Sequence, residues 1–172
     1  MYPFLPLQQV DPYTVQQSVG SGGRAIGAFL GTLVVGGLLL VFLEDAFERV
    51  VGVVETEPVS SFFWGLGFLI ALVVVVVVLV VTIVGILIAV PLVIVALLVD
   101  FAGSAAVYVS VGSRIAEAAD WKASRWGHLL VGAVVAGLVA ALPVVGGLVS
   151  FVVGGIGVGA IARDWYRRHE GA

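Results

Sequence analysis

Long stretches without a charged residue constrain this chain more than any other feature of its sequence. Residues 58–99, between Glu57 and Asp100, contain no Asp, Glu, Lys or Arg, and neither do residues 25–43 and 126–162. A bilayer core is about 30 Å thick, so a helix needs about 20 apolar residues to cross it. Buried strands of soluble proteins are much shorter, about 4–8 residues between polar turns. The chain is therefore predicted to be an integral membrane protein.

Composition supports this prediction and excludes several classes of function. Charged residues make up 11% of the chain, against about 25% in soluble domains. The absence of cysteine excludes disulfides and thiolate metal sites. Acids outnumber bases 11 to 8, which argues against nucleic-acid binding. The sequence motifs of zinc proteases, serine hydrolases and phosphate-binding loops are missing. We expect no enzyme activity, no metal site and no cofactor.

The apolar stretches predict an all-α fold, a polytopic integral membrane helical bundle. We expect about five transmembrane helices, with two hairpins and short interfacial helices. Residues 1–24 are expected to form a flexible polar tail, residues 25–162 a single transmembrane domain, and residues 163–172 a basic cytoplasmic tail. The five spans are expected at residues 25–43, 61–81, 88–112, 127–142 and 145–162.

Two glycine-containing segments divide the longest stretches. Turns are expected at residues 82–85 and 142–147, because glycine permits tight turns and proline interrupts helices. The last pair of helices is short enough to form either two complete spans or a shallow hairpin. Residues 44–55 have apolar positions at helical spacing, which fits either an interfacial helix or a solvated acidic loop. Residues 114–126 form a basic loop in which a further short interfacial helix is possible.

Basic residues and tryptophans predict the orientation of the chain in the membrane. With the N-terminus outside and the C-terminus cytoplasmic, seven of the eight basic residues lie on the inner side, and only Arg24 lies outside. Tryptophans prefer the membrane–water interface. The four expected interface anchors on the inner side are Trp64, Trp121, Trp126 and Trp165.

Small residues recur at a spacing of four, which allows helices to approach closely in lipid. We expect these residues either to pack the helices of one chain together or to join chains in a homo-oligomer. The candidate helix-packing residues are Gly27 and Gly31, then Gly146, Ser150 and Gly154, and finally Gly155 and Gly159.

Asp100 is the acid that falls inside an apolar stretch. Ser104 and Tyr108 follow at intervals of four, so the three side chains share one helix face. An ionisable residue inside a membrane indicates an ion or proton pathway. A buried acid that forms hydrogen bonds to Ser104, Thr82 or Thr32 is the alternative explanation.

Two motifs together resemble a known membrane module. TIVGILIAV, residues 82–90, resembles the TVVGIPLAL-like turn in the multi-span C-terminal regions of bactofilin-like, polymer-forming cytoskeletal proteins. LPVVGGLVSFVVGGIGVGAIA, residues 142–162, is similar to the stretch that closes the same regions, and the resemblance covers about residues 61–162. This chain has Leu87 where the module has proline, with Pro91 four residues later, and it lacks the polymerising domain. The resemblance implies a membrane module attached to an envelope or cytoskeletal assembly.

The sequence therefore predicts a non-enzymatic membrane protein that acts as an anchor, scaffold or accessory subunit. Its expected partners are the lipid bilayer and a second copy or another membrane protein. The alternative is a small ion or solute channel or transporter that uses Asp100.

Overall fold

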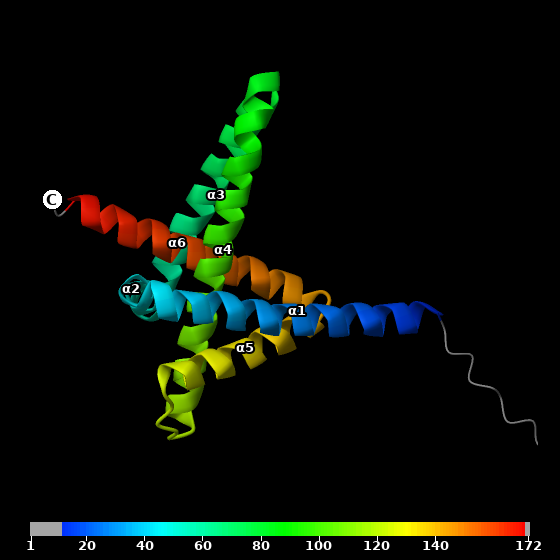
Figure 1. Ribbon diagram of the computed structural model, residues 1–172, viewed down its shortest axis with the longest axis vertical. Coiled ribbons are helices and arrows are strands. Elements are labelled where there is room, and N and C mark those ends of the chain that lie inside the picture. The colour runs from blue at the N-terminus through cyan, green and yellow to red at the C-terminus, as the bar shows by residue number, and fades with distance from the viewer. Residues whose placement is uncertain (1–11, 171–172) are drawn as a thin grey trace, which may run out of the picture.

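The structure is a computed structural model that describes residues 12–170, and its regular elements are six α-helices (Figure 1). The helices are α1 (Pro12–Phe42), α2 (Glu44–Thr56), α3 (Pro58–Val80), α4 (Ile83–Ala118), α5 (Arg125–Ala141) and α6 (Val145–Glu170). This confirms the all-α prediction.

Four of these helices are long and apolar enough to cross a membrane, which makes the chain a multi-span membrane protein. The four candidate spans are Gly20–Phe42, Pro58–Val80, Gly85–Ala118 and Val145–His169. The remaining expected span, residues 127–142, corresponds to α5, which has 17 residues. At about 1.5 Å per residue, α5 is shorter than the thickness of a bilayer core.

Helices α1 and α6 extend further than the sequence predicted. Helix α1 begins at Pro12, although residues up to 24 were expected to form a flexible tail; residues 1–11 of that tail lie outside the described residues. Helix α6 continues to Glu170 instead of ending at residue 162. Adding a residue to an existing helix is much easier than starting one, so a helix formed in an apolar stretch continues into neighbouring polar residues.

Helix α4 is also longer than the expected span of residues 88–112. It begins just after Thr82, whose side-chain oxygen accepts a hydrogen bond from the backbone N–H of Gly85 at 2.9 Å. It then runs through Pro91 and reaches Ala118. The possible interfacial helix in residues 114–126 is therefore absent from the described chain, since its first residues belong to α4 and residues 119–124 form a loop.

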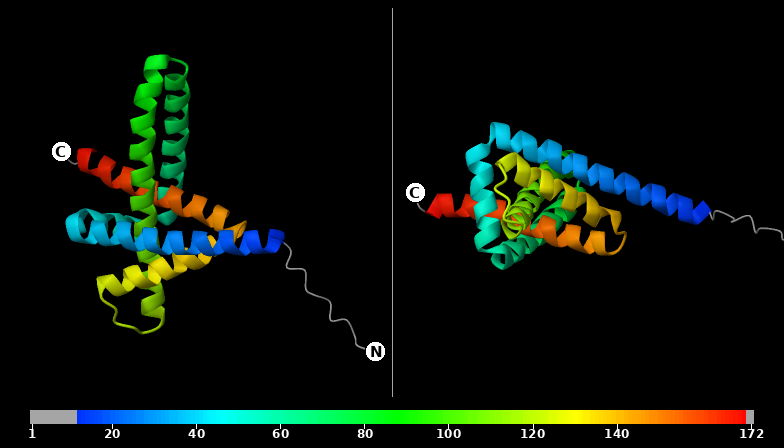
Figure 2. Two further views of the ribbon diagram at one scale, coloured as in Figure 1. Left: turned by 45° about the vertical axis from the view of Figure 1, so that its right-hand side comes forward. Right: turned by 90° about the horizontal axis from the view of Figure 1, so that it is seen from below.

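Helices α3 and α4 form a long hairpin, and α1 runs across α4 below the upper part of this hairpin (Figures 1 and 2). Helix α6 packs against both α3 and α4, while α5 packs between α1 and α4. The end of this hairpin around the α3–α4 turn extends beyond the crossing helices (Figure 2), and we call residues 73–98 the arm. Most large apolar side chains of the arm are exposed, as is typical of a surface covered by lipid.

The core of the protein surrounds the second half of α4. Helix α4 contacts all five other helices. Residues 105–110 are buried in an unbroken run, so this part of α4 is covered on every side. Leu129 of α5 is completely buried beside it. The arm and the buried half of α4 meet near Asp100, which places this acid at the boundary between exposed and buried apolar surface.

Candidate functional site

Asp100 lies where α6 crosses α4, and it is half-buried. Its side chain faces Gly154 of α6: a Cβ atom at that position would lie 2.6 Å from Oδ1 of Asp100. Any side chain larger than hydrogen at residue 154 would therefore displace the carboxylate. Gly154 leaves the space that the acid occupies.

Two cavities meet at Asp100. The larger, of about 450 Å³, lies between α3, α4 and α6 and has a mostly apolar wall that includes Leu69, Leu72 and Phe151. The smaller, of about 190 Å³, lies between α1, α4, α5 and α6. Asp100 and Ser150 line both cavities, so these two side chains form the polar part of the wall that the cavities share.

Hydroxyl groups from three helices surround the smaller cavity with Asp100. They belong to Thr32 of α1, Ser104 and Tyr108 of α4, and Ser150 of α6. The side chains of Tyr108 and Ser150 line the same part of this cavity wall from two different helices. A carboxylate with several hydroxyl oxygens is the kind of group that accepts a proton or a hard cation. We call these five residues the polar cluster.

The sequence placed Asp100, Ser104 and Tyr108 on one helix face, and the structure places all three at the smaller cavity. Ser150 was expected in a helix-packing row, yet it belongs to the polar cluster as well. Residue spacing reveals which side chains share a helix, whereas Ser150 comes from a different helix. Its position at the same cavity as Tyr108 leaves no signal in a single sequence.

The predicted helix-packing residues have different surroundings. Gly155 lies against the ring of Phe62, and Gly159 lies against the backbone of Ser61 and Gly65. Gly146 approaches Val139 in the turn that joins α5 to α6. Gly27 and Gly31 line the smaller cavity, and a Cβ atom at either position would meet nothing within 4 Å.

Further close helix crossings involve Gly65, Gly103 and Gly157, which were not singled out from the sequence. A Cβ atom on Gly65 of α3 would overlap the backbone carbonyl of Gly155 in α6. Gly103 of α4 and Gly157 of α6 face each other in the same way. Helix α6 therefore uses glycines on two faces, one against α3 and one against α4. Such contacts let helices pack in lipid, where no hydrophobic driving force exists between them.

Charged side chains join α2 and the α2–α3 junction to three other helices. Arg125 of α5 pairs with Glu44 and with Glu48, the latter at 2.8 Å. Arg114 of α4 donates a hydrogen bond to the backbone oxygen of Glu55 at 3.0 Å. Further pairs reach α6: Arg49 with Asp164, and Glu57 with both Arg163 and Arg167. We call this network the charged collar.

Glu57 is the acid of the collar whose titration is most clearly changed. Its hydrogen bond with Arg167, at 2.7 Å, lowers the pKa of the carboxyl below its ordinary 4.5, and nearby Arg163 lowers this pKa further. The ionised form of Glu57 is therefore stabilised in the folded protein. The pairing fixes the start of α3 to the end of α6.

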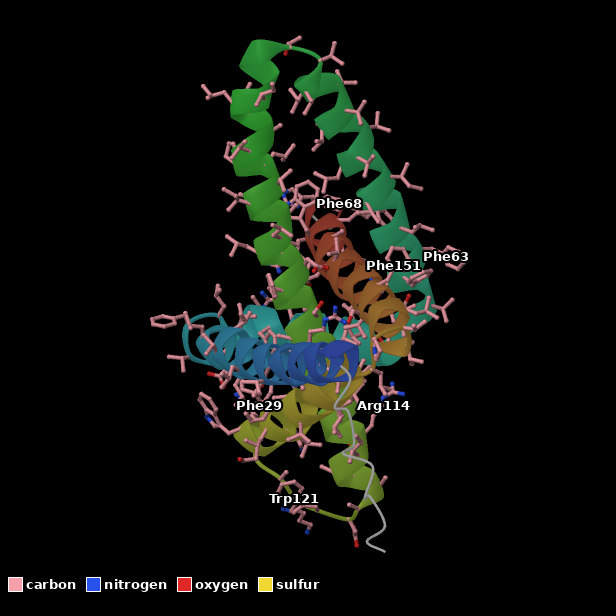
Figure 3. The ribbon with its side chains drawn as sticks, turned by 90° about the vertical axis from the view of Figure 1, so that its right-hand side faces the viewer. Phe29, Phe63, Phe68, Arg114, Trp121 and Phe151 are labelled. Atoms are coloured by element: carbon pink, nitrogen blue, oxygen red, sulfur yellow. The ribbon has the colours of Figure 1, made fainter. Side chains whose placement is uncertain are left out.

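The predicted interface tryptophans fall into two groups. Trp64 packs on Tyr166 with a ring-centroid distance of 5.3 Å, and Trp165 packs on His169 at 4.4 Å. Trp126 lies against Gly37 of α1, and Trp121 lies in the α4–α5 loop, at the end of the molecule opposite the arm (Figure 3). All four side chains are exposed.

Comparison with known proteins identifies one similarity. Residues 8–170 match the family described as a domain of unknown function, DUF8173. This match includes the region that resembles the membrane module of bactofilin-like proteins, but it shows no link to them. A search of curated proteins and of solved structures found no significant match.

Proposed function

The chain belongs to the DUF8173 family, and from this premise we propose that it is a non-enzymatic membrane anchor, scaffold or accessory subunit. The observation that carries the proposal is the apolar arm, residues 73–98, whose outer end extends beyond the packed helices. The helices below the arm are fixed to one another by glycine crossings and the charged collar. A rigid base with a long apolar projection suits a protein that holds a position in the bilayer and contacts other helices there.

The resemblance to bactofilin-like membrane modules supports the kind of assembly that the protein would serve. The resemblance covers about residues 61–162, which include the arm and the larger part of α6. The resemblance concerns the membrane module of those proteins and does not extend to their polymerising domain. The proposed role is thus attachment of an envelope or cytoskeletal assembly to the membrane through a partner, rather than polymer formation by this chain.

The proposed orientation places the N-terminus outside and the C-terminus in the cytoplasm. Termini on opposite sides require an odd number of crossings, so in this proposal the 17-residue α5 crosses a locally thinned bilayer in addition to the four long helices. The charged collar supports this orientation, because the basic residues of α2, α4, α5 and α6 that form it lie close together. Basic residues collect on the cytoplasmic side of membrane proteins. The collar and the four tryptophans would then lie at the inner interface.

Purification from the native membrane in a mild detergent, followed by mass spectrometry of bound proteins, tests the proposed role. A photoreactive amino acid at Val77 of the arm should form crosslinks to a second copy or to another membrane protein. The same group at Asp120, in the α4–α5 loop, is the control position. A monodisperse monomer without bound protein, and without crosslinks from Val77, would refute the proposal.

A second candidate function, transport of a proton or small cation, is favoured by the polar cluster. Asp100 lines two cavities on different sides of α6, and hydroxyl groups surround one of them. Ionisable residues in membrane spans commonly serve such pathways. In this candidate function Asp100 takes up the proton or cation, and Tyr108 and Ser150 orient the neighbouring oxygens.

Flux measurements in proteoliposomes distinguish this second candidate from the first. Asp100→Asn removes the charge and changes the size of the side chain very little, so it should abolish flux if Asp100 carries the ion. Asp120→Asn makes the same change in an exposed loop and should leave flux unchanged. Equal flux in the Asp100→Asn variant and the unmodified protein would remove the acid from any transport mechanism.

A further inference from the structure

A wide groove separates part of α3 from the second half of α6 on the outer surface of the protein. Its volume is about 830 Å³, within the range of about 300–1,000 Å³ that is common for ligand pockets. The residues that line it are apolar or aromatic: Phe63, Trp64, Gly67, Phe68, Ala71, Val99, Val158, Ile161, Ala162, Trp165 and Tyr166. The size and lining of the groove suit a hydrocarbon chain.

Aromatic side chains gather at one end of this groove. Trp64 of α3 and Tyr166 of α6 pack together there, with ring centroids 5.3 Å apart. Trp165 follows on α6 and is largely exposed. Aromatic rings with a polar edge prefer the level of lipid headgroups, whereas the remaining lining is purely apolar. The groove thus has one end suited to the headgroup region and one suited to the hydrocarbon region.

Cationic side chains continue beyond the aromatic end. Arg168 and His169 follow Trp165 at intervals of three and four residues, so they lie on the same face of α6. The ring of His169 packs on Trp165, and the side chain of Arg168, which pairs with Asp164 of the same helix, is about half exposed.

The ion pairs at this end leave an excess of positive charge. Four arginines pair there with two carboxylates, and Glu170 follows at the end of α6, which leaves a surplus of one charge. The arginines are Arg49, Arg163, Arg167 and Arg168, and the carboxylates are Glu57 and Asp164. An anion is therefore the expected complement of this end of the groove.

We propose that the groove binds an anionic phospholipid, with an acyl chain against the apolar lining and the phosphate beside Arg168 and His169. The apolar lining selects a hydrocarbon chain, and the surplus of positive charge selects an acidic headgroup. Basic side chains at a membrane surface each favour an acidic lipid by about fivefold. This lipid site lies apart from the polar cluster and does not depend on the function proposed above.

Quenching of tryptophan fluorescence by brominated lipids tests the proposal directly, because Trp64 and Trp165 lie in the groove. The full chain with Trp121→Phe and Trp126→Phe leaves only these two reporters. It is reconstituted in phosphatidylcholine vesicles that contain a small fraction of either brominated phosphatidylglycerol or brominated phosphatidylcholine. Brominated phosphatidylglycerol should reach the same degree of tryptophan quenching at a concentration at least about fivefold lower than brominated phosphatidylcholine. Equal quenching by the two lipids would overturn the proposal.

Three variants, each made in the chain with Trp121→Phe and Trp126→Phe, test whether the preference for phosphatidylglycerol arises in the groove. Arg168→Gln should lower the preference for phosphatidylglycerol by about fivefold. Lys122→Gln removes the same charge in the α4–α5 loop and should leave the preference unchanged. Ala162→Phe fills the groove and should reduce the preferential quenching, while circular dichroism verifies that the helices are intact. Equal effects of Arg168→Gln and Lys122→Gln, or unchanged quenching in Ala162→Phe, would contradict a lipid site here.

Discussion

Replacement of Gly65 by alanine tests whether glycine crossings hold α3 against α6. A methyl group at residue 65 would overlap the backbone carbonyl of Gly155. A backbone atom cannot rotate away as a side chain can, so the two helices must separate. Gly67, two residues later in α3, provides a matched control, because a Cβ atom there would meet nothing within 4 Å.

Two opposing effects determine how much each alanine substitution changes the free energy of unfolding. Alanine favours a helix by about 1 kcal/mol relative to glycine, and this gain applies equally to Gly65→Ala and Gly67→Ala. Overpacking costs about 1–3 kcal/mol and applies only at Gly65. We therefore expect Gly67→Ala to be neutral or stabilising, and Gly65→Ala to be less stable than Gly67→Ala by about 1–3 kcal/mol.

Equilibrium unfolding in mixed micelles, followed by fluorescence, measures this difference. Trp64 precedes Gly65 and packs on Tyr166 of α6, so its emission should respond to separation of the two helices. The Gly65→Ala midpoint should fall below that of Gly67→Ala, and Trp64 emission should change before unfolding begins. Equal stability of the two alanine variants would refute the conclusion that α3 and α6 meet through their backbones.

Three further predictions concern the core, the collar and the arm. Leu129→Ala should lower the free energy of unfolding by about 2–5 kcal/mol because this side chain is fully buried, whereas Leu130→Ala, at a half-exposed position, should cost far less in the same micelle assay. Glu57→Gln should lower the free energy of unfolding at pH 7, because it removes the ion pairs of Glu57 with Arg163 and Arg167. Below the lowered pKa of Glu57 the carboxyl of the unmodified chain is protonated, so the two proteins should then be equally stable. A difference in stability that persists at that pH would contradict the ion pairs. Thr82→Ala removes the N-cap of α4 and should cost about 0.5–2 kcal/mol, with amide exchange at Gly85 increasing most; uniform exchange would argue against the cap.

The helical composition of the fold followed from a single physical quantity, the length of each uncharged stretch. Residues 58–99 are too long for one helix across a bilayer and about long enough for two, and the structure divides them between α3 and α4. Helix ends were less predictable. Polar residues before residue 25 and after residue 162 do not stop a helix that has already formed, so α1 and α6 continue into them.

The candidate site was predictable only where its residues share one helix. The spacing of Asp100, Ser104 and Tyr108 places them on one face of α4, and all three reach the smaller cavity. Contacts between helices carry no such signal. Glycine spacing identifies a face on which helices can approach closely, but it does not identify the partner, so the crossing of Gly65 and Gly155 became evident only in the fold.

Cysteine labelling of the arm in intact membrane vesicles tests the central claim that this apolar projection lies within the bilayer. The chain has no native cysteine, so a single cysteine introduced at Val77 in the arm or at Asp120 in the α4–α5 loop is the one thiol that the reagent can label. A charged, membrane-impermeant maleimide, present on both sides of the membrane, should label Asp120→Cys rapidly. Val77→Cys should react only after the vesicles are dissolved in a denaturing detergent. Equally rapid labelling of both positions in intact vesicles would show that water reaches the arm and would contradict the account.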